Sequence, residues 1–209
     1  SRIRTIKTIL RKYRLNTVCE EAKCPNITEC FEKKTATFMI LGRCCTRDCR
    51  FCAVSGSPPE PVSDEEPYMI MNMVRELGIK YAVITSVTRD DLPDGGAGQF
   101  CRVMELLKGG IEGLKIEVLV PDFNGNPQSV RSVLAAKPHV FNHNLETVAH
   151  LYDEIRPGAD FSRSVNILRT ARDSGNGILV KTGVMTGFGE SMTDLAELFY
   201  EIRDLVDII

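Results

Sequence analysis

The sequence lacks any apolar run that approaches the roughly 20 residues of a membrane-spanning helix, and no signal-peptide pattern opens it. It also lacks a strong charge of either sign, because 26 Lys and Arg oppose 28 Asp and Glu, for a net charge of −2. This balance is typical of a globular protein and argues against a disordered chain or a polyanion-binding protein. The first residue is Ser1 and not a methionine, which is consistent with a missing upstream segment. A cytoplasmic location of the bacterial type is the prediction, and the start at Ser1 leaves an organellar location open.

The sequence also has few histidines and no glycine-rich dinucleotide-binding motif after its first predicted strand. The three histidines, His139, His143 and His150, are too scattered to form a metal site, and each is predicted to be a satisfied barrel or surface histidine. No G-x-G-x-x-G follows the first predicted strand, which argues against a dinucleotide-binding fold. The chemistry of this chain is therefore expected from another residue type.

Cysteine is abundant and unevenly placed. Seven of the eight cysteines lie within the first 52 residues, and only Cys101 lies beyond them. Without an export signal disulfides are disfavoured, because thiols stay reduced in the cytosol. Thiolates held close together in a reducing compartment usually bind a metal. Outside the motifs described below, Cys101 is predicted to be a small core residue and Cys44 a packed free thiol.

Strand-length apolar runs alternate with amphipathic helical stretches along the chain. Strands joined by helical crossovers form a parallel sheet with right-handed connections. We therefore predict an α/β fold, a partial TIM-type (β/α) barrel that is truncated in about the sixth strand. Residues 1–34 are expected to form a cysteine-rich extension, and residues 35–209 the incomplete barrel. Strands are predicted at residues 36–42, 80–86, 114–120, 139–143 and 177–185, and residues 206–209 resemble the first half of a sixth.

The stretch RCCTRDCRFCAV follows the first predicted strand, at the end where (β/α) barrels build their sites. Within it, Cys45, Cys49 and Cys52 have the spacing CxxxCxxC. Three thiolates on one loop can bind a [4Fe–4S] cluster and leave its fourth iron open. A zinc ion held by these thiolates and a fourth group such as Cys44 is the alternative, although zinc sites favour paired CxxC turns. A thioredoxin-like redox pair is less favoured, because no CxxC opens a helix.

Phe51, immediately before the last of these cysteines, completes a pattern that resembles the radical S-adenosylmethionine (SAM) superfamily. The resemblance implies that the open iron chelates the amino and carboxylate groups of SAM, and that one electron then cleaves the sulfonium to a 5′-deoxyadenosyl radical. A second triplet, CxxxxCxxxxxC, resembles the auxiliary-cluster motif of the lipoyl synthase family; its members are Cys19, Cys24 and Cys30. The resemblance to that family runs in register along essentially the whole chain, through ATFMILG, CTRDCRFC, VITSVTRDDLPDGG, LVPDF, VFNHNLETV, IRPGADF and KTGVMTGFGE.

The resemblance to lipoyl synthases implies a sulfurtransferase that inserts two sulfur atoms at C6 and C8 of an octanoyl chain bound to a carrier-protein lysine. Because these carbons have no acidic proton, a cofactor must supply radical chemistry. The implied cofactors are SAM and two [4Fe–4S] clusters, of which the second is the sulfur source. The implied partners are an octanoylated lipoyl-carrier domain, an electron donor of the ferredoxin or flavodoxin type and an iron–sulfur cluster carrier, with no nucleic acid and no membrane. Another sulfur-inserting enzyme similar to biotin synthase, disfavoured by the leading triplet, and a non-catalytic zinc-binding domain are the alternatives.

The resemblance also implies roles for individual residues. Cys45, Cys49 and Cys52 are assigned to the cluster that binds SAM, and Cys19, Cys24 and Cys30 to the auxiliary cluster. For each acidic residue a solvated turn is the alternative. The expected SAM-binding residues are Phe51 near the adenine, Ser86, Asp90, Asp91, Gly95 and Gly96 at the amino-acid end, and Asn144 and Arg163 at the ribose or carboxylate.

One feature of the family is missing from this sequence. The auxiliary cluster of the family takes a fourth ligand from a serine in an Arg-Ser-Ser-Tyr motif, whereas Arg131-Ser132 and Arg163-Ser164 both continue into valine here. The chain also ends within the expected sixth strand. We therefore expect a fragment that is truncated at its carboxyl side, with an active full-length parent, and expect this piece to be unable to complete sulfur insertion.

Overall fold

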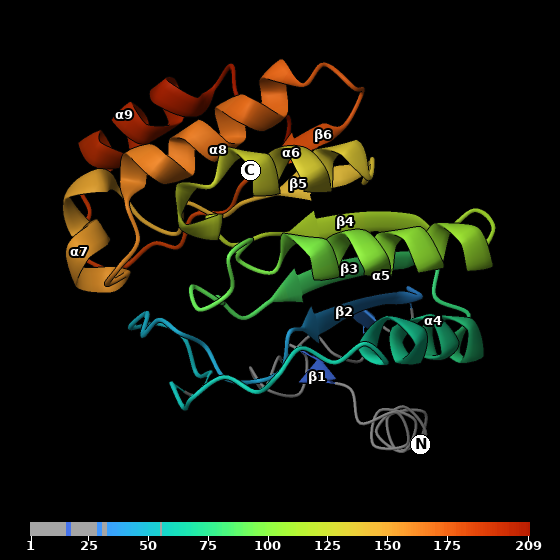
Figure 1. The fold of residues 1–209 in the computed structure, drawn as a ribbon. Helices are drawn as coiled ribbons and strands as arrows, with labels where there is room; N and C mark the ends of the chain where they lie inside the picture. The colour runs from blue at the N-terminus through green and yellow to red at the C-terminus, as the bar shows by residue number, and fades with distance from the viewer. Residues whose placement is uncertain (1–15, 18–28, 31–32, 55) are drawn as a thin grey trace.

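A single twisted sheet organises the chain in the computed structural model, which describes residues 16–17, 29–30, 33–54 and 56–209. The sheet has six strands in the order β1-β2-β3-β4-β5-β6 (Figure 1). β1 pairs with β2 in the antiparallel direction, and every later neighbour pairs in parallel. The strands are β1 (Asn16–Thr17), β2 (Thr35–Ile40), β3 (Tyr81–Ser86), β4 (Lys115–Leu119), β5 (Val140–Asn142) and β6 (Leu179–Lys181).

Helices connect the parallel strands, and four of the longer ones, α4, α5, α6 and α8, lie along one face of the sheet (Figure 1). Local sequence signals start several of them: the Asn126 side chain caps α6, Asp160 caps α8, and Ser191 with Asp194 forms a capping box for α9. The helical segments are α4 (Glu66–Leu77), α5 (Ala97–Gly110), η1 (Phe123–Gly125), α6 (Pro127–Ala135), η2 (Ala149–Leu151), α7 (Tyr152–Ile155), α8 (Phe161–Asp173) and α9 (Met192–Ile202).

The hydrophobic core lies between the sheet and these helices. Because successive strand residues point to opposite faces, Ile116 and Val118 of β4 enter this core, and Glu117 faces the interior of the incomplete barrel. The burial of large side chains from strand and helix alike fixes the register of the sheet and so the position of each loop at its carboxyl edge. Fully buried members include Phe38, Ile84 and Phe141 from the strands and Met73, Phe100 and Leu107 from the helices.

The predicted elements are present, with shorter strands than the apolar runs suggested. β2 ends at Ile40, because Leu41 and Gly42 have φ values of +69° and +88°, which lie outside the extended region of a regular strand. The run predicted as strand 177–185 contains only β6, and the predicted sixth strand appears as a single parallel bridge between Lys181 and Ile208. The antiparallel β1 was not predicted.

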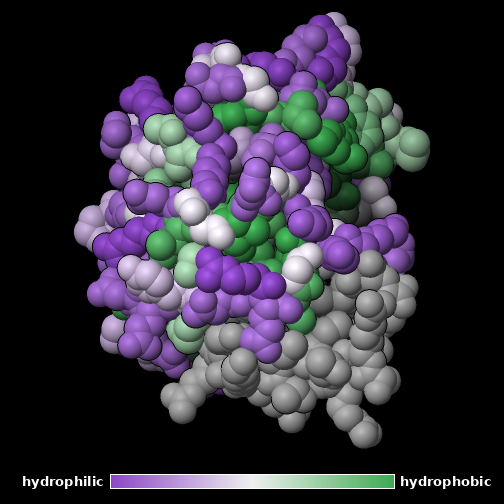
Figure 2. Space-filling view, turned by 90° about the vertical axis from the view of Figure 1, so that its right-hand side faces the viewer, coloured by the Kyte–Doolittle hydropathy of each residue, from purple (hydrophilic) through white to green (hydrophobic). Residues whose placement is uncertain are grey.

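The two ends of the sheet differ in character. The loops that follow the strands lie on the left of Figure 1, where the cysteine loop is drawn in blue and cyan. The opposite end, seen in Figure 2, is hydrophilic around its margin and shows apolar side chains at its centre and upper right. Among the residues that the structure describes, no helix has the length and apolar character to cross a membrane.

Candidate cluster-binding site

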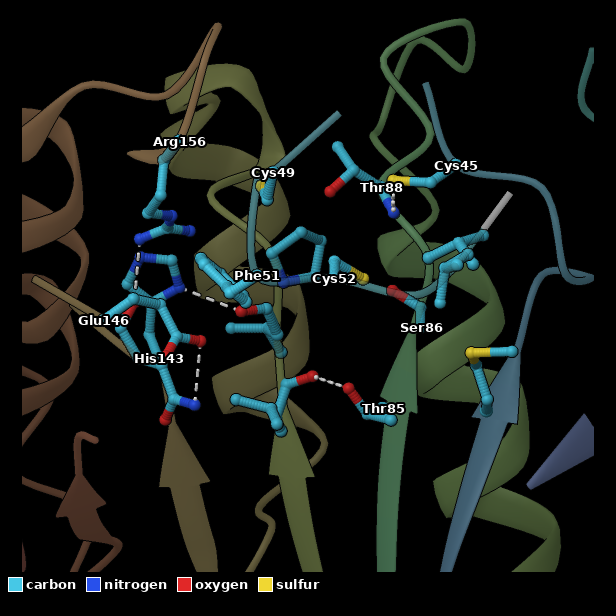
Figure 3. A pocket seen from close by; sticks show the side chains of 17 residues that line it. Cys45, Cys49, Phe51, Cys52, Thr85, Ser86, Thr88, His143, Glu146 and Arg156 are labelled. Carbon is cyan, nitrogen blue, oxygen red and sulfur yellow. Dashed lines mark hydrogen bonds between the residues drawn. The ribbon is translucent and has the colours of Figure 1, made fainter. Parts of the chain in front are cut away.

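A cavity of about 170 Å³ opens where the carboxyl ends of the strands meet the cysteine loop (Figure 3). All three cysteines of the CxxxCxxC motif line it, although the loop that carries them follows β2 and most of the other wall residues follow β3, β4 and β5. The predicted residues Phe51, Ser86 and Asn144 line it too. The structure therefore brings six of the predicted site residues to one cavity.

Cys45 is held at the start of the loop by backbone groups. Its Sγ accepts hydrogen bonds from the backbone N–H of Thr88, at 3.3 Å, and of Arg47, at 3.5 Å. The neighbouring Thr46 donates its backbone N–H to the Thr88 carbonyl at 3.1 Å. These contacts join the cysteine loop to the loop after β3.

Cys49 and Cys52 occupy the far end of the loop. Cys49 is half-buried, and burial raises the pKa of its thiol; the neighbouring Cys45 and Cys52 raise it further, while Arg156 opposes them. The backbone N–H of Arg50 donates to the Ile155 carbonyl of α7 at 3.0 Å, which fixes this end of the loop beside α7. Cys52 is exposed, and its N–H donates to the Cys49 carbonyl at 3.0 Å in a tight turn.

Three thiols on one loop can in principle serve a cluster or a single metal ion. In the described part of the chain no three Cys, His, Asp or Glu side chains converge as one metal ion requires. Zinc needs its ligands about 2.0–2.3 Å from one point. A cubane cluster instead takes each thiolate on a different iron, so its ligands stand further apart. Cys45, Cys49 and Cys52 around one cavity supply the three thiols that such a cluster takes.

His143 contributes an unpaired acceptor to the cavity wall. Burial and the Arg156 charge lower the pKa of His143 to about 4, so the imidazole is neutral near neutral pH. Its Nδ1 lies 2.8 Å from the Val120 carbonyl, which can only accept, so Nδ1 carries the hydrogen. Nε2 is then a buried acceptor that has no partner among the described residues. A satisfied histidine was the wrong prediction for His143; His139 bonds to the Ile116 N–H, and His150 is exposed.

Arg156 and Glu146 also line the cavity and were not predicted (Figure 3). Arg156 Nη1 donates to the Asn144 carbonyl at 3.0 Å and to the Tyr152 hydroxyl at 2.8 Å. Glu146 accepts from Asn144 Nδ2 at 3.0 Å, and burial raises the pKa of its carboxyl group. The sequence signal for this pair was limited to the charged residues within the stretches NLET and IRPGAD. The two side chains meet in the cavity only because of the path that the chain takes after β5.

The remaining predicted SAM-binding residues are not in the lining of this cavity. Asp90 is bound by Arg47, and Asp91 by Arg89 at 2.8 Å. Gly95 and Gly96 precede α5, where the close approach they permit is to Phe123 and Leu41. Arg163 lies 3.1 Å from Asp122. Their contacts with SAM stay predictions.

The other cysteines fall into two groups. Cys19 and Cys24 of the leading triplet lie outside the described residues, and Cys30 is half-buried. Cys44 is buried as a free thiol, as predicted, and the half-buried Cys101 packs against the core. Neither Cys44 nor Cys101 lines the cavity.

Known proteins resemble this chain in sequence and in fold. The family profile of the radical SAM superfamily matches residues 39–201. The lipoyl synthase of Aquifex aeolicus (strain VF5) is 50% identical over 205 residues, which cover 98% of this chain and 74% of that protein. The lipoyl synthase of Caldanaerobacter subterraneus subsp. tengcongensis is 48% identical over 200 residues, covering 96% and 70%.

Solved structures support the fold assignment. Methylornithine synthase matches with a TM-score of 0.63 at 16% identity, over 98% of this chain and 62% of its own. The FeFe-hydrogenase maturase HydG from Carboxydothermus hydrogenoformans matches with a TM-score of 0.65 at 14% identity, over 82% and 40%. The predicted partial (β/α) barrel is thereby confirmed. With a superfamily profile over most of its length and relatives at about half identity, the chain belongs to the lipoyl synthase family of the radical SAM superfamily.

Proposed function

We propose that the full-length protein to which this chain belongs carries out the lipoyl synthase reaction, the SAM-dependent insertion of two sulfur atoms at C6 and C8 of a protein-bound octanoyl group. The observation that carries the proposal is the convergence of Cys45, Cys49 and Cys52 on one cavity at the carboxyl edge of a parallel sheet. Relatives named lipoyl synthase, about 50% identical over nearly the whole chain, support the substrate class.

Cys45, Cys49 and Cys52 would hold a [4Fe–4S] cluster, which supplies the electron for reductive cleavage of SAM. The rest of the cavity supplies the polar contacts that a ligand with hydroxyl, amino and carboxylate groups needs. His143 Nε2 would accept a hydrogen bond, because it is a neutral buried acceptor without a partner in the described chain. The buried Ser86 hydroxyl, likewise unpartnered among the described residues, would contribute a second contact. Phe51 and Asn144 line the same space.

Arg156 gives the cavity a fixed positive charge beside the thiols. Its Nη1 is bonded to backbone and to Tyr152, and its Nε is buried without a partner in the described residues. An anionic thiolate-ligated cluster and the carboxylate of SAM would both be stabilised next to this guanidinium. The roles of Asp90, Asp91, Gly95, Gly96 and Arg163 in binding SAM belong to the proposal as predictions from the family resemblance.

A second cluster, on Cys19, Cys24 and Cys30, is proposed as the sulfur source. Its support is the CxxxxCxxxxxC spacing, and β1, which ends two residues before Cys19, is paired with β2. Residues 1–34 as the auxiliary extension and 35–209 as the catalytic barrel are part of the same proposal.

The proposed partners follow from the reaction. An octanoylated lipoyl-carrier domain would present the substrate, a ferredoxin- or flavodoxin-type protein would deliver electrons, and an iron–sulfur carrier would rebuild the spent cluster. The relatives are bacterial proteins, which supports a cytoplasmic location.

Anaerobic reconstitution tests the proposal. For the full-length protein we expect about eight irons with matching sulfide per chain, 5′-deoxyadenosine on addition of SAM and reductant, and an octanoyl-lysine peptide that gains two carbon–sulfur bonds. Bound zinc without sulfide would overturn the cluster assignment. A chain that cleaves SAM and leaves the peptide unchanged would contradict the sulfur-insertion step alone.

A further inference from the structure

Arg47 lies inside the CxxxCxxC loop, between Cys45 and Cys49, and its side chain is only 6% exposed. Its guanidinium is gripped from two sides by carboxylates. Nε and Nη2 donate to the two oxygens of Asp90 at 2.8 and 2.9 Å, and Nη1 and Nη2 donate to the two oxygens of Asp122 at 2.8 Å each. Asp90 follows β3 and Asp122 follows β4, so one side chain of the cysteine loop joins the ends of two strands.

The Asp122 carboxylate is held in position to bind the Arg47 guanidinium. Its side chain is fully buried, and it also accepts the Asn124 N–H at 3.0 Å and Arg163 Nη1 at 3.1 Å. Burial alone would raise the pKa of Asp122, but the hydrogen bonds and charge of Arg47 outweigh it, and the pKa is lowered. Because the buried Asp122 carboxylate has all its hydrogen-bond partners, its side chain is held in one orientation. The bonds to this carboxylate in turn fix the Arg47 guanidinium.

The anchor is connected directly to the first cysteine. Thr46 Oγ1 donates to the Thr88 carbonyl at 3.1 Å and accepts the Asp90 N–H at 3.1 Å. The same stretch places the N–H groups of Thr88 and Arg47 on Cys45 Sγ. Movement of Arg47 away from Asp90 would therefore displace two donors from that sulfur.

We propose that Arg47 is a positioning residue that fixes the cysteine loop against the ends of β3 and β4, with Cys45 Sγ beneath two N–H donors, before a cluster binds. The inference rests on the proposed role of Cys45 as a cluster ligand. Hydrogen bonds to cluster sulfurs are one of the features that set the reduction potential, and groups behind metal ligands commonly change affinity by about 10–100-fold. Arg47 thus acts through the loop and does not itself contact the reacting atoms.

The experiment compares Arg47→Lys with Arg50→Lys in a chain whose Cys19, Cys24 and Cys30 are alanine, so that one cluster is observed. Lysine keeps the charge at position 47 but cannot make the four-bond fork. Arg50 is the matched control because it belongs to the same loop and its side chain is 64% exposed. Its ion-pair contact, with Glu154, is long at 3.4 Å. After reconstitution, the readouts are the rate of iron loss to a chelator, the electron paramagnetic resonance spectrum and the reduction potential.

For Arg47→Lys we expect iron loss about tenfold faster or more, an altered resonance spectrum and a more negative potential, because the reduced cluster loses N–H···S bonds. Arg50→Lys should match the parent chain in each. Hydrogen exchange of the metal-free chain adds a readout without cluster: the Thr46 amide should exchange faster in Arg47→Lys and at the unchanged rate in Arg50→Lys.

Asp90→Asn keeps the test valid if Arg47→Lys does not fold. Asp90 is 29% exposed, and asparagine there would lack the negative charge and one of the two acceptor oxygens, while Arg47 would remain paired with Asp122. We expect changes of the same sign and smaller size. If the parent takes up a cluster and both variants match it, this inference is overturned while the proposed function stands. If the parent takes up no cluster, the proposed function fails, and this inference with it.

Discussion

Lys181 Nζ lies 2.9 Å from Glu117 Oε1 in the interior of the incomplete barrel, beneath the cysteine cavity. Glu117 is 5% exposed, and it also accepts from the Tyr81 hydroxyl at 2.6 Å and from Asn142 Nδ2 at 3.3 Å. Burial and then the Glu117 hydrogen bond raise the pKa of Tyr81, so its hydroxyl remains a donor. A buried carboxylate thereby connects side chains from β3, β4, β5 and β6.

Lys181→Met should destabilise the chain, because Glu117 would lose its cation. We expect a loss of about 1–3 kcal/mol in the free energy of unfolding, below the value for a fully buried pair since Lys181 is 34% exposed. Urea unfolding of the metal-free chain measures it. The Glu117→Gln, Lys181→Met double variant should lie closer to the parent, and equal losses in both would show that the ion pair is not the cause.

His143 should make stability depend on pH. Its pKa is 6.5 in an ordinary environment and about 4 in the fold, so between pH 6.5 and about pH 4 the unfolded chain binds a proton that the folded chain does not. Stability must then fall as the pH decreases from 6.5 towards 4 and level off below it, by about 3 kcal/mol in total. Comparison of the parent with His143→Asn by urea unfolding at several pH values isolates this contribution. A difference between the two chains that is independent of pH would contradict it.

Gly96 should be intolerant of a side chain. Its φ is +89°, and a Cβ would lie 2.2 Å from Leu41 Cδ1. We expect Gly96→Ala to lower the free energy of unfolding by about 1–3 kcal/mol through overpacking and backbone strain. Gly109, near the end of the helix α5 that Gly96 precedes, has nothing within 4 Å of its Cβ position, so Gly109→Ala should be neutral or stabilise by about 0.5–1 kcal/mol. Thermal unfolding of the pair decides; equal effects would refute the packing explanation.

In the full-length protein, the two cysteine triplets should be separable by their products. Cys49→Ala is expected to abolish 5′-deoxyadenosine formation, since Cys49 belongs to the cavity triplet. Cys24→Ala should retain part of that cleavage and lose sulfur insertion. Chromatography of the nucleoside and mass spectrometry of an octanoyl-lysine peptide measure both. Equal loss of both reactions in the two variants would argue against the division of labour.

The fold was largely readable from local patterns. The Ser191–Asp194 capping box and the parallel order of β2 to β6 follow from residues close together in the sequence, and the structure has both. Strand ends were less predictable, because Leu41 leaves β2 to donate its N–H to Glu66, 25 residues away. No apolar run encodes such a contact.

The site was predictable where its functional residues lie close together in the sequence. The spacing of Cys45, Cys49 and Cys52 placed three thiols on one loop, and the structure lines one cavity with them. The free acceptor of His143 depends on the Val120 carbonyl, and the grip on Arg47 depends on Asp122, 75 residues away. Both arise from the registers of β4 and β5, which residue spacing alone does not specify.

The cysteine loop is attached to the segments that follow three successive strands: to Thr88 after β3, to Asp122 after β4 and to Ile155 of α7 after β5. It therefore spans the carboxyl edge of the curved sheet and connects the ends of its strands. Flattening or widening the sheet would stretch the loop and move the thiols apart. A distortion of the open edge of the barrel would consequently change the geometry of the sulfur ligands.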